Sequence, residues 1–87
     1  MKSKEVKEQF YRAVLSLENE KECSDFFSDV CTEKEVETIA QRFAVARMLS
    51  DGKPYSEIVA ATGASSATVS RVNRAMSKGL KRAVKKV

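Results

Sequence analysis

Apolar side chains recur at spacings of three and four residues along much of the chain, which is the period of an amphipathic helix. The first such stripe follows Ser3 and consists of Val6, Phe10, Ala13, Val14 and Leu17. No segment shows a sustained alternation of polar and apolar residues, and glycine and proline are scarce. The pattern therefore predicts an all-α fold with about six helices.

Capping residues divide the pattern into helices. Asn19 can cap a short second helix with Glu22 at its third position, and Thr32 to Glu35 form a capping box for a third helix. The third helix is expected to run to about Ser50 and to end at Gly52. Its second half, "AQRFAVARML" (residues 40–49), is apolar on nearly every side, which is typical of a buried helix. Because one short chain can hardly surround it, we expect a homodimer.

The segment after Gly52 predicts two short helices separated by a glycine turn. Lys53 and Pro54 begin a helix over residues 55–62, and Gly63 ends it. Ser65 or Ser66 then caps a helix over residues 67–77 that stops near Gly79. This is the pattern of a helix-turn-helix. We expect one domain, 1–87, with dimerisation helices in 1–50, the helix-turn-helix in 53–78 and a basic helix in 80–87.

A wheel at 100° per residue separates two faces of the predicted helix 67–77. Val69, Val72 and Met76 fall on the inner side. The outer side carries small residues first and cations later: Ala67, Ser70, Arg71, Arg74 and Lys78. Small residues allow close approach to base edges in a major groove, and the cations suit phosphates or guanines.

The charge distribution supports an anionic partner. Residues 1–49 hold 8 Lys/Arg and 10 Asp/Glu, a net charge of −2, whereas residues 50–87 hold 8 Lys/Arg and 2 Asp/Glu, a net charge of +6. A basic half of a small domain is typical of binding to double-stranded DNA. Because no signal sequence or apolar stretch of membrane-spanning length is present, we expect a cytoplasmic protein that is not inserted in a membrane.

An enzyme is not expected, and neither a catalytic residue nor a metal ligand is assigned. The sequence has no histidine, the commonest general base and metal ligand. Cys23 and Cys31 are eight residues apart and stand among Phe26, Phe27 and Val30, so they are interpreted as small core residues rather than as a metal or redox pair.

The run Gly63, Ala64, Ala67, Thr68, Val69, Ser70 and Arg71 resembles the turn and recognition helix of the Trp repressor superfamily. The upstream Thr32, Arg42 and Gly52 extend the resemblance over about residues 30–78, and it is nearest to the Trp-repressor-like branch of the YerC/YecD type. The resemblance implies an intertwined dimer that acts as a sequence-specific transcriptional regulator, expected to be a repressor. The predicted DNA-contacting residues are Lys53, Tyr55, Ser56, Ser65, Ser66, Ala67, Thr68, Ser70, Arg71, Arg74 and Lys78. Tyr55, Ser56, Ser65 and Ser66 differ in identity from the repressor's residues, so its operator is not carried over.

The same resemblance implies a candidate effector site at Thr32, Arg42 and Arg71, which match the repressor's tryptophan-binding positions. Two guanidinium groups suit an aromatic amino acid, since they stack on a ring and bind a carboxylate. The chain departs from the repressor at Ala75, where a serine contacts the ligand, and at Val72, where a glycine stands. No other cofactor is expected.

Two alternatives keep the fold but change the function. In one, the dimer binds another protein through its acidic half and the helix-turn-helix is structural. In the other, the chain is the DNA-binding part of a mobile-element protein, although no catalytic domain accompanies it.

Overall fold

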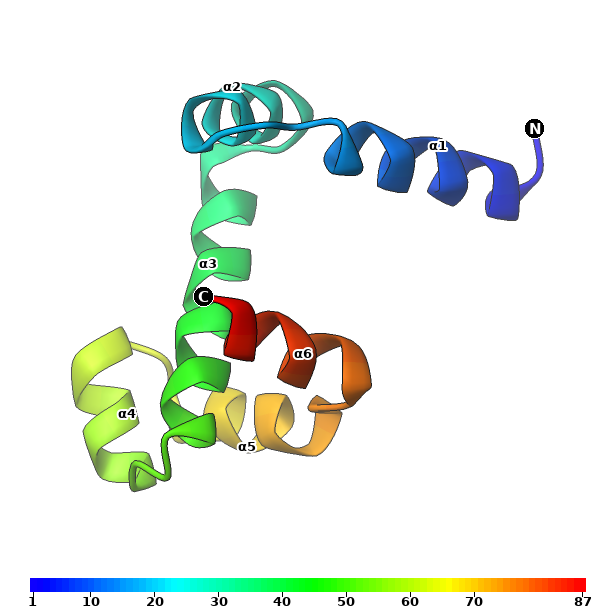
Figure 1. The fold of residues 1–87 in the computed structure, drawn as a ribbon. Coiled ribbons are helices and arrows are strands. Elements are labelled where there is room, and N and C mark those ends of the chain that lie inside the picture. The colour runs from blue at the N-terminus through cyan, green and yellow to red at the C-terminus, as the bar shows by residue number, and fades with distance from the viewer. The chain divides into compact units, whose positions relative to one another are not determined.

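The computed structural model describes residues 1–87 and contains six helices and no strand (Figure 1). The helices are α1 (Ser3–Leu15), α2 (Glu20–Val30), α3 (Glu33–Ser50), α4 (Tyr55–Thr62), α5 (Ser66–Ala75) and α6 (Lys78–Lys86). The predicted all-α fold is confirmed. None of the helices combines the length and the apolar character that crossing a membrane requires.

The chain divides into two compact units, residues 1–36 and residues 37–87. The first unit holds α1, α2 and the start of α3, and none of its residues is buried. Its helices meet through aromatic rings, with 6.0 Å between the centroids of Phe10 and Phe26 and 5.2 Å between those of Phe26 and Phe27. Cys23 and Cys31 are free, half-buried thiols. The first unit therefore has little core of its own.

The caps predicted from the sequence are present. The backbone N–H of Glu22 donates to the side chain of Asn19 at 2.9 Å. At the start of α3, the N–H of Glu35 donates to Thr32 Oγ1 at 3.1 Å, and the N–H of Thr32 donates to Glu35 Oε1 at 2.8 Å. These reciprocal bonds satisfy donors that a helix N-terminus leaves free, which explains why α3 begins after Thr32.

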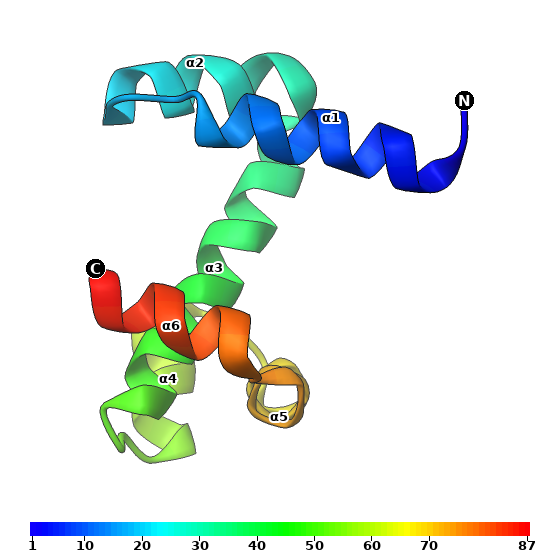
Figure 2. The same ribbon diagram turned by 45° about the vertical axis from the view of Figure 1, so that its right-hand side comes forward.

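The second unit contains the hydrophobic core, formed where the end of α3 meets α4, α5 and α6 (Figure 2). The buried side chains are Val45, Ala46, Ile58, Ala64, Val69, Val72 and Val84. Leu80 and Met76 pack against this cluster, so the apolar stripe of α6 faces inward, whereas its cations remain exposed. The core thus fixes α4 and α5 against one another and against α3.

Within one chain, α3 is less buried than its composition suggests. Val45 and Ala46 are buried, whereas Ala40 and Ala44 are exposed and Ile39 retains 54% of its accessible surface. Apolar residues therefore face solvent on two sides of this helix.

Two predicted boundaries were wrong. The helix expected to run to about residue 77 ends at Ala75, because Met76 adopts an extended backbone and packs its side chain on the core. Gly79 does not stop that helix but lies inside α6, which begins at Lys78 rather than at residue 80. Lys78 consequently belongs to α6 and not to the outer side of α5. Pro54 lies just before α4 as its cap residue, with an extended backbone.

Candidate nucleic-acid interface

The turn between α4 and α5 depends on Gly63. This residue has φ of 75°, in the left-handed region that glycine adopts without a steric penalty, and its N–H donates to the carbonyl of Val59 at 3.0 Å. The next residue, Ala64, is 3% exposed, and its N–H donates to Thr62 Oγ1 at 3.2 Å. The turn is therefore closed by one backbone bond and one bond to the Thr62 hydroxyl, and it is held by a small buried side chain.

The start of α5 is set by Ser65. The N–H of Thr68 donates to Ser65 Oγ at 3.1 Å, and the Ser65 hydroxyl lies 3.1 Å from Thr68 Oγ1. This resolves the choice between the two serines, because Ser65 is the cap and Ser66 is the first helical residue. The side chain of Ser66 makes no such bond and is exposed.

The sides of α5 follow the predicted wheel. Val69 is fully buried and Val72 is 7% exposed, whereas Ala67, Arg71 and Arg74 are exposed. We call the side formed by Ala67, Ser70, Arg71 and Arg74 the outward face of α5. On it, Arg74 Nη1 donates to Ser70 Oγ at 2.8 Å, so this guanidinium lies along the helix toward its N-terminal half.

The start of α4 adjoins the last half of α5 through a bond that the sequence did not suggest. Asn73 Nδ2 donates to the hydroxyl of Tyr55 at 3.2 Å. Asn73 was not among the predicted site residues. The available signal was its place on the wheel, since it lies at the edge between the buried and outward sides of α5. Lys53, two residues before Tyr55, forms an ion pair with Glu57 at 4.0 Å, and both side chains are about half exposed.

The predicted DNA-contacting residues all lie in the second unit. Thr68 and Ser70 are half-buried, and the others are exposed: Lys53, Tyr55, Ser56, Ser65, Ser66, Ala67, Arg71, Arg74 and Lys78. Lys78 comes from α6, as described above. The set thus presents hydroxyl groups and cations around a turn and two helix starts, which is the chemistry that binds phosphates and base edges.

Two of the three predicted effector residues share a pocket. Arg42 on α3 and Arg71 on α5 line a cavity of about 180 Å³ together with Thr68, Val72 and Ala75. We call it the arginine pocket. Thr32 lies in the first unit, where its hydroxyl caps α3. The side chain of Val72 forms part of the wall.

A helix-turn-helix in an all-α chain defines a class of DNA-binding proteins, and comparison with known proteins gives the family. The sequence matches the family described as Trp repressor protein over residues 5–86. The chain belongs to the Trp repressor family, which suggests a DNA-binding regulator. The resemblance stated from the residues is therefore confirmed.

Individual relatives agree with this assignment. The chain is 46% identical over 79 residues to the uncharacterised protein YerC of Bacillus subtilis (strain 168), covering 91% of this chain and 75% of that protein. A TrpR-like protein from Eubacterium eligens ATCC 27750 has a similar crystal structure, with a TM-score of 0.85, 45% identity and coverage of 91% of this chain and 84% of that one. A Trp repressor candidate from Staphylococcus aureus gives a TM-score of 0.88 at 36% identity, covering 93% and 84% of the two chains.

Proposed function

We propose that the protein is a sequence-specific transcriptional regulator, acting as a repressor, that binds double-stranded DNA as a homodimer through α4 and α5. The observation that carries the proposal is the outward face of α5, which follows the left-handed Gly63 turn. Its Ala67, Arg71 and Arg74 are exposed, Ser70 is half-buried, and it holds no acidic residue. Membership of the Trp repressor family supports it.

The residues suit a division of labour along α5. At its N-terminal end, Ser66, Ala67 and Ser70 are small enough for the backbone to approach base edges, and the hydroxyls of Ser66 and Ser70 can bond bases or bridging waters. Arg71 and Arg74 lie further along and are suited to phosphates or guanines. Ser65 serves the helix as its cap, so we assign it to positioning more than to base recognition.

The experiment is an unbiased selection of bound duplexes followed by affinity measurements on selected and random DNA at about 50 and 200 mM salt. Several phosphate contacts predict a steep loss of affinity with salt, and specificity predicts a preference for the selected sequence. Ser66→Arg and Ser70→Arg should change that preference. If both variants leave affinity and preference untouched, α5 does not enter the groove.

The homodimer is supported by apolar surface that one chain leaves uncovered. In the first unit Leu15 is 82% exposed, Tyr11 57% and Val30 56%, and on α3 Ile39 is 54% exposed. A unit of 36 residues without a buried side chain cannot support itself by its own core, since domains below about 40 residues usually need a staple or a partner. A second copy of the chain would cover this surface.

Sedimentation of the wild type and of an Ile39→Gln variant tests the dimer. The wild type should sediment as a dimer, and Ile39→Gln should raise its dissociation constant. The control is Glu37→Gln, which places the same glutamine side chain two residues away on the same helix. It should leave the dimer intact. A wild type that sediments as a monomer at high micromolar concentration overturns this part of the proposal.

The arginine pocket is proposed as the site of effector control. Its two arginines and its apolar wall suit an aromatic amino acid. Thermal-shift measurements with millimolar aromatic amino acids test this, with Arg42→Ala as the variant that should abolish a shift. Ala75→Ser should strengthen binding by adding a hydroxyl group for the ligand. The absence of any shift with the wild type leaves Arg42 as a structural residue.

A further inference from the structure

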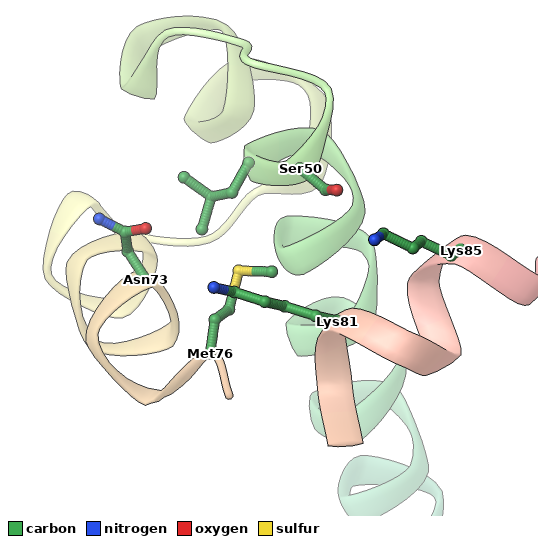
Figure 3. A pocket seen from close by; sticks show the side chains of 6 residues that line it. Ser50, Asn73, Met76, Lys81 and Lys85 are labelled. Atoms are coloured by element: carbon green, nitrogen blue, oxygen red, sulfur yellow. The ribbon is translucent and has the colours of Figure 1, made fainter. Parts of the chain in front are cut away.

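A second pocket in the 37–87 unit lies beside α5, away from the arginine pocket. Its volume is about 260 Å³, and it is open to solvent and lined by Leu49, Ser50, Asn73, Met76, Lys81 and Lys85 (Figure 3). We call it the lysine pocket. Its α5 residue Asn73 lies about 160° around the helix axis from Ala75 of the arginine pocket. The two pockets therefore flank the outward face of α5 on opposite sides.

The charge in the lysine pocket has no partner in the structure. Lys81 and Lys85 make no ion pair and no hydrogen bond, and no carboxylate lines the cavity. They stand one helical turn apart on α6, so the two ammonium groups repel one another. Figure 3 shows both side chains extending from α6 toward the ends of α3 and α5. An anion between them would relieve the repulsion.

The rest of the lining adds recognition groups to this charge. Ser50 offers a hydroxyl, and Leu49 and Met76 offer an apolar wall. Asn73 Nδ2 is bonded to Tyr55, and Figure 3 shows the amide oxygen on the side of Lys81. Because a tyrosine hydroxyl both donates and accepts, turning the amide over keeps the bond to Tyr55 and directs an N–H group into the pocket.

We propose that the lysine pocket binds a phosphate group, held by the ammonium groups of Lys81 and Lys85 and by the Asn73 amide. Two point charges suit a free phosphate or phosphomonoester better than a carboxylate, because it carries more charge and more acceptor oxygens. A backbone phosphodiester carries one negative charge on two free oxygens, which the two ammonium groups can share. The apolar wall suits the sugar or carbon skeleton attached to it. Anchoring of α6 by Leu80 and buried Val84 fixes both lysines toward the site.

The phosphate can come from two sources. One is the DNA backbone, because a helix in the major groove is flanked by phosphates and the pocket lies on a flank of α5. This source rests on the proposed function and extends the protein's footprint beyond the helix-turn-helix. The other is a free phosphorylated molecule, whose binding would be communicated to Tyr55 at the start of α4 through Asn73.

The test compares a double variant, Lys81→Ala/Lys85→Ala, with a matched control, Arg82→Ala/Lys86→Ala. Each double variant removes two exposed cations of α6 that lie one helical turn from each other. The control residues, Arg82 and Lys86, do not line the pocket. Each protein is titrated with duplex DNA at several salt concentrations. Separately, each is titrated with inorganic phosphate against sodium chloride of equal ionic strength, with the Asn73 side-chain amide followed by NMR.

If the pocket binds a phosphate of the DNA backbone, the pocket variant should bind duplex DNA roughly tenfold more weakly at 0.1 M salt. The slope of its log affinity against log salt concentration should fall by about 0.9 per pocket, and the control should stay near wild type. If the pocket binds a free phosphate, DNA binding should be unchanged in the pocket variant. The NMR signal of the Asn73 side-chain amide should then shift saturably with inorganic phosphate in the wild type and the control, and this shift should be lost in the pocket variant. Lys81→Arg/Lys85→Arg should retain whichever activity is found.

The proposal is overturned if neither titration separates the pocket variant from the control. A wild type that binds no DNA at low salt contradicts the proposed function instead, and the phosphate titration still decides the fate of the pocket.

Discussion

The side-chain amide of Gln41 donates a hydrogen bond of 3.1 Å to the backbone carbonyl of Thr62, the last residue of α4. Thr62 in turn donates its hydroxyl to the carbonyl of Ile58 at 2.8 Å and accepts from the N–H of Ala64. The end of α4, where carbonyl groups lack helical partners, is therefore tied to α3 at the point where the chain turns toward α5.

Replacing Gln41 by Ala should destabilise the protein by about 1 kcal/mol, because a half-buried carbonyl loses its partner. Urea denaturation measures the change as a lower midpoint at an unchanged slope. Arg47→Ala, at an exposed position of the same helix and unit, is the control and should stay within about 0.5 kcal/mol of wild type. Equal effects at the two positions would mean that the Gln41 bond contributes nothing to stability.

Two of the glycines give opposite predictions for the same substitution. Gly63→Ala should cost about 1–2 kcal/mol because its φ of 75° strains any residue with a Cβ, although a Cβ there would meet only Gln41 Nε2 at 3.9 Å. Gly79→Ala should stabilise by up to about 1 kcal/mol, since this residue lies inside α6 with nothing near its Cβ position. Thermal unfolding should therefore shift in opposite directions. A stabilising Gly63→Ala would contradict the turn.

The two adjacent serines at the start of α5 have different roles, because Ser65 caps the helix and Ser66 is an exposed helical residue. Ser65→Ala should destabilise by about 1 kcal/mol because it removes the acceptor for the Thr68 N–H. Ser66→Ala should leave the free energy of unfolding nearly unchanged, since its side chain caps nothing. Chemical denaturation of the two variants side by side measures the difference. If Ser66→Ala is the costlier change, Ser65 is not the residue that caps α5.

Arg74→Ala should weaken binding to all DNA sequences by a similar factor and lower the salt slope by about 0.9 for each phosphate that the guanidinium neutralises. Because Arg74 donates a hydrogen bond to Ser70, the variant Ser70→Ala should release the guanidinium group of Arg74. We expect this variant to alter the DNA sequence preference more than the overall affinity. Arg47→Ala, an exposed arginine on α3, is the control for removal of charge alone. Fluorescence anisotropy with selected and random duplexes measures the DNA affinity of all three variants. If Arg47→Ala weakens DNA binding as much as Arg74→Ala, then Arg74 is not part of the interface.

The sequence predicted the helices and the turn because their signals are local. Asn19, Thr32, Gly52 and Gly63 each act within a few residues of themselves, and each is found at the boundary where it was expected. The inner side of α5 was equally predictable, since Val69 and Val72 follow the helical period. Local chemistry and tertiary packing agree at these positions.

The features that were missed depend on contacts between distant segments. The early end of α5 results from Met76 packing on a core built from four helices. No capping residue near Met76 indicates in the sequence that the helix ends there. Asn73 looked like an ordinary polar residue until the fold brought Tyr55 within 3.2 Å of it. Lys81 and Lys85 likewise resembled any other part of a basic helix, because a pocket between three helices has no signature along the chain.

All seven buried side chains lie in residues 37–87, so the two units of a single chain should differ in how long their backbone amides resist exchange with solvent. Amides of α1 and α2 should exchange quickly, and a protease should cut there first and leave a folded fragment with α4, α5 and α6. In dilute solution, one melting temperature would not describe the whole chain. The unit that holds the helix-turn-helix would therefore stay folded after the first unit has opened.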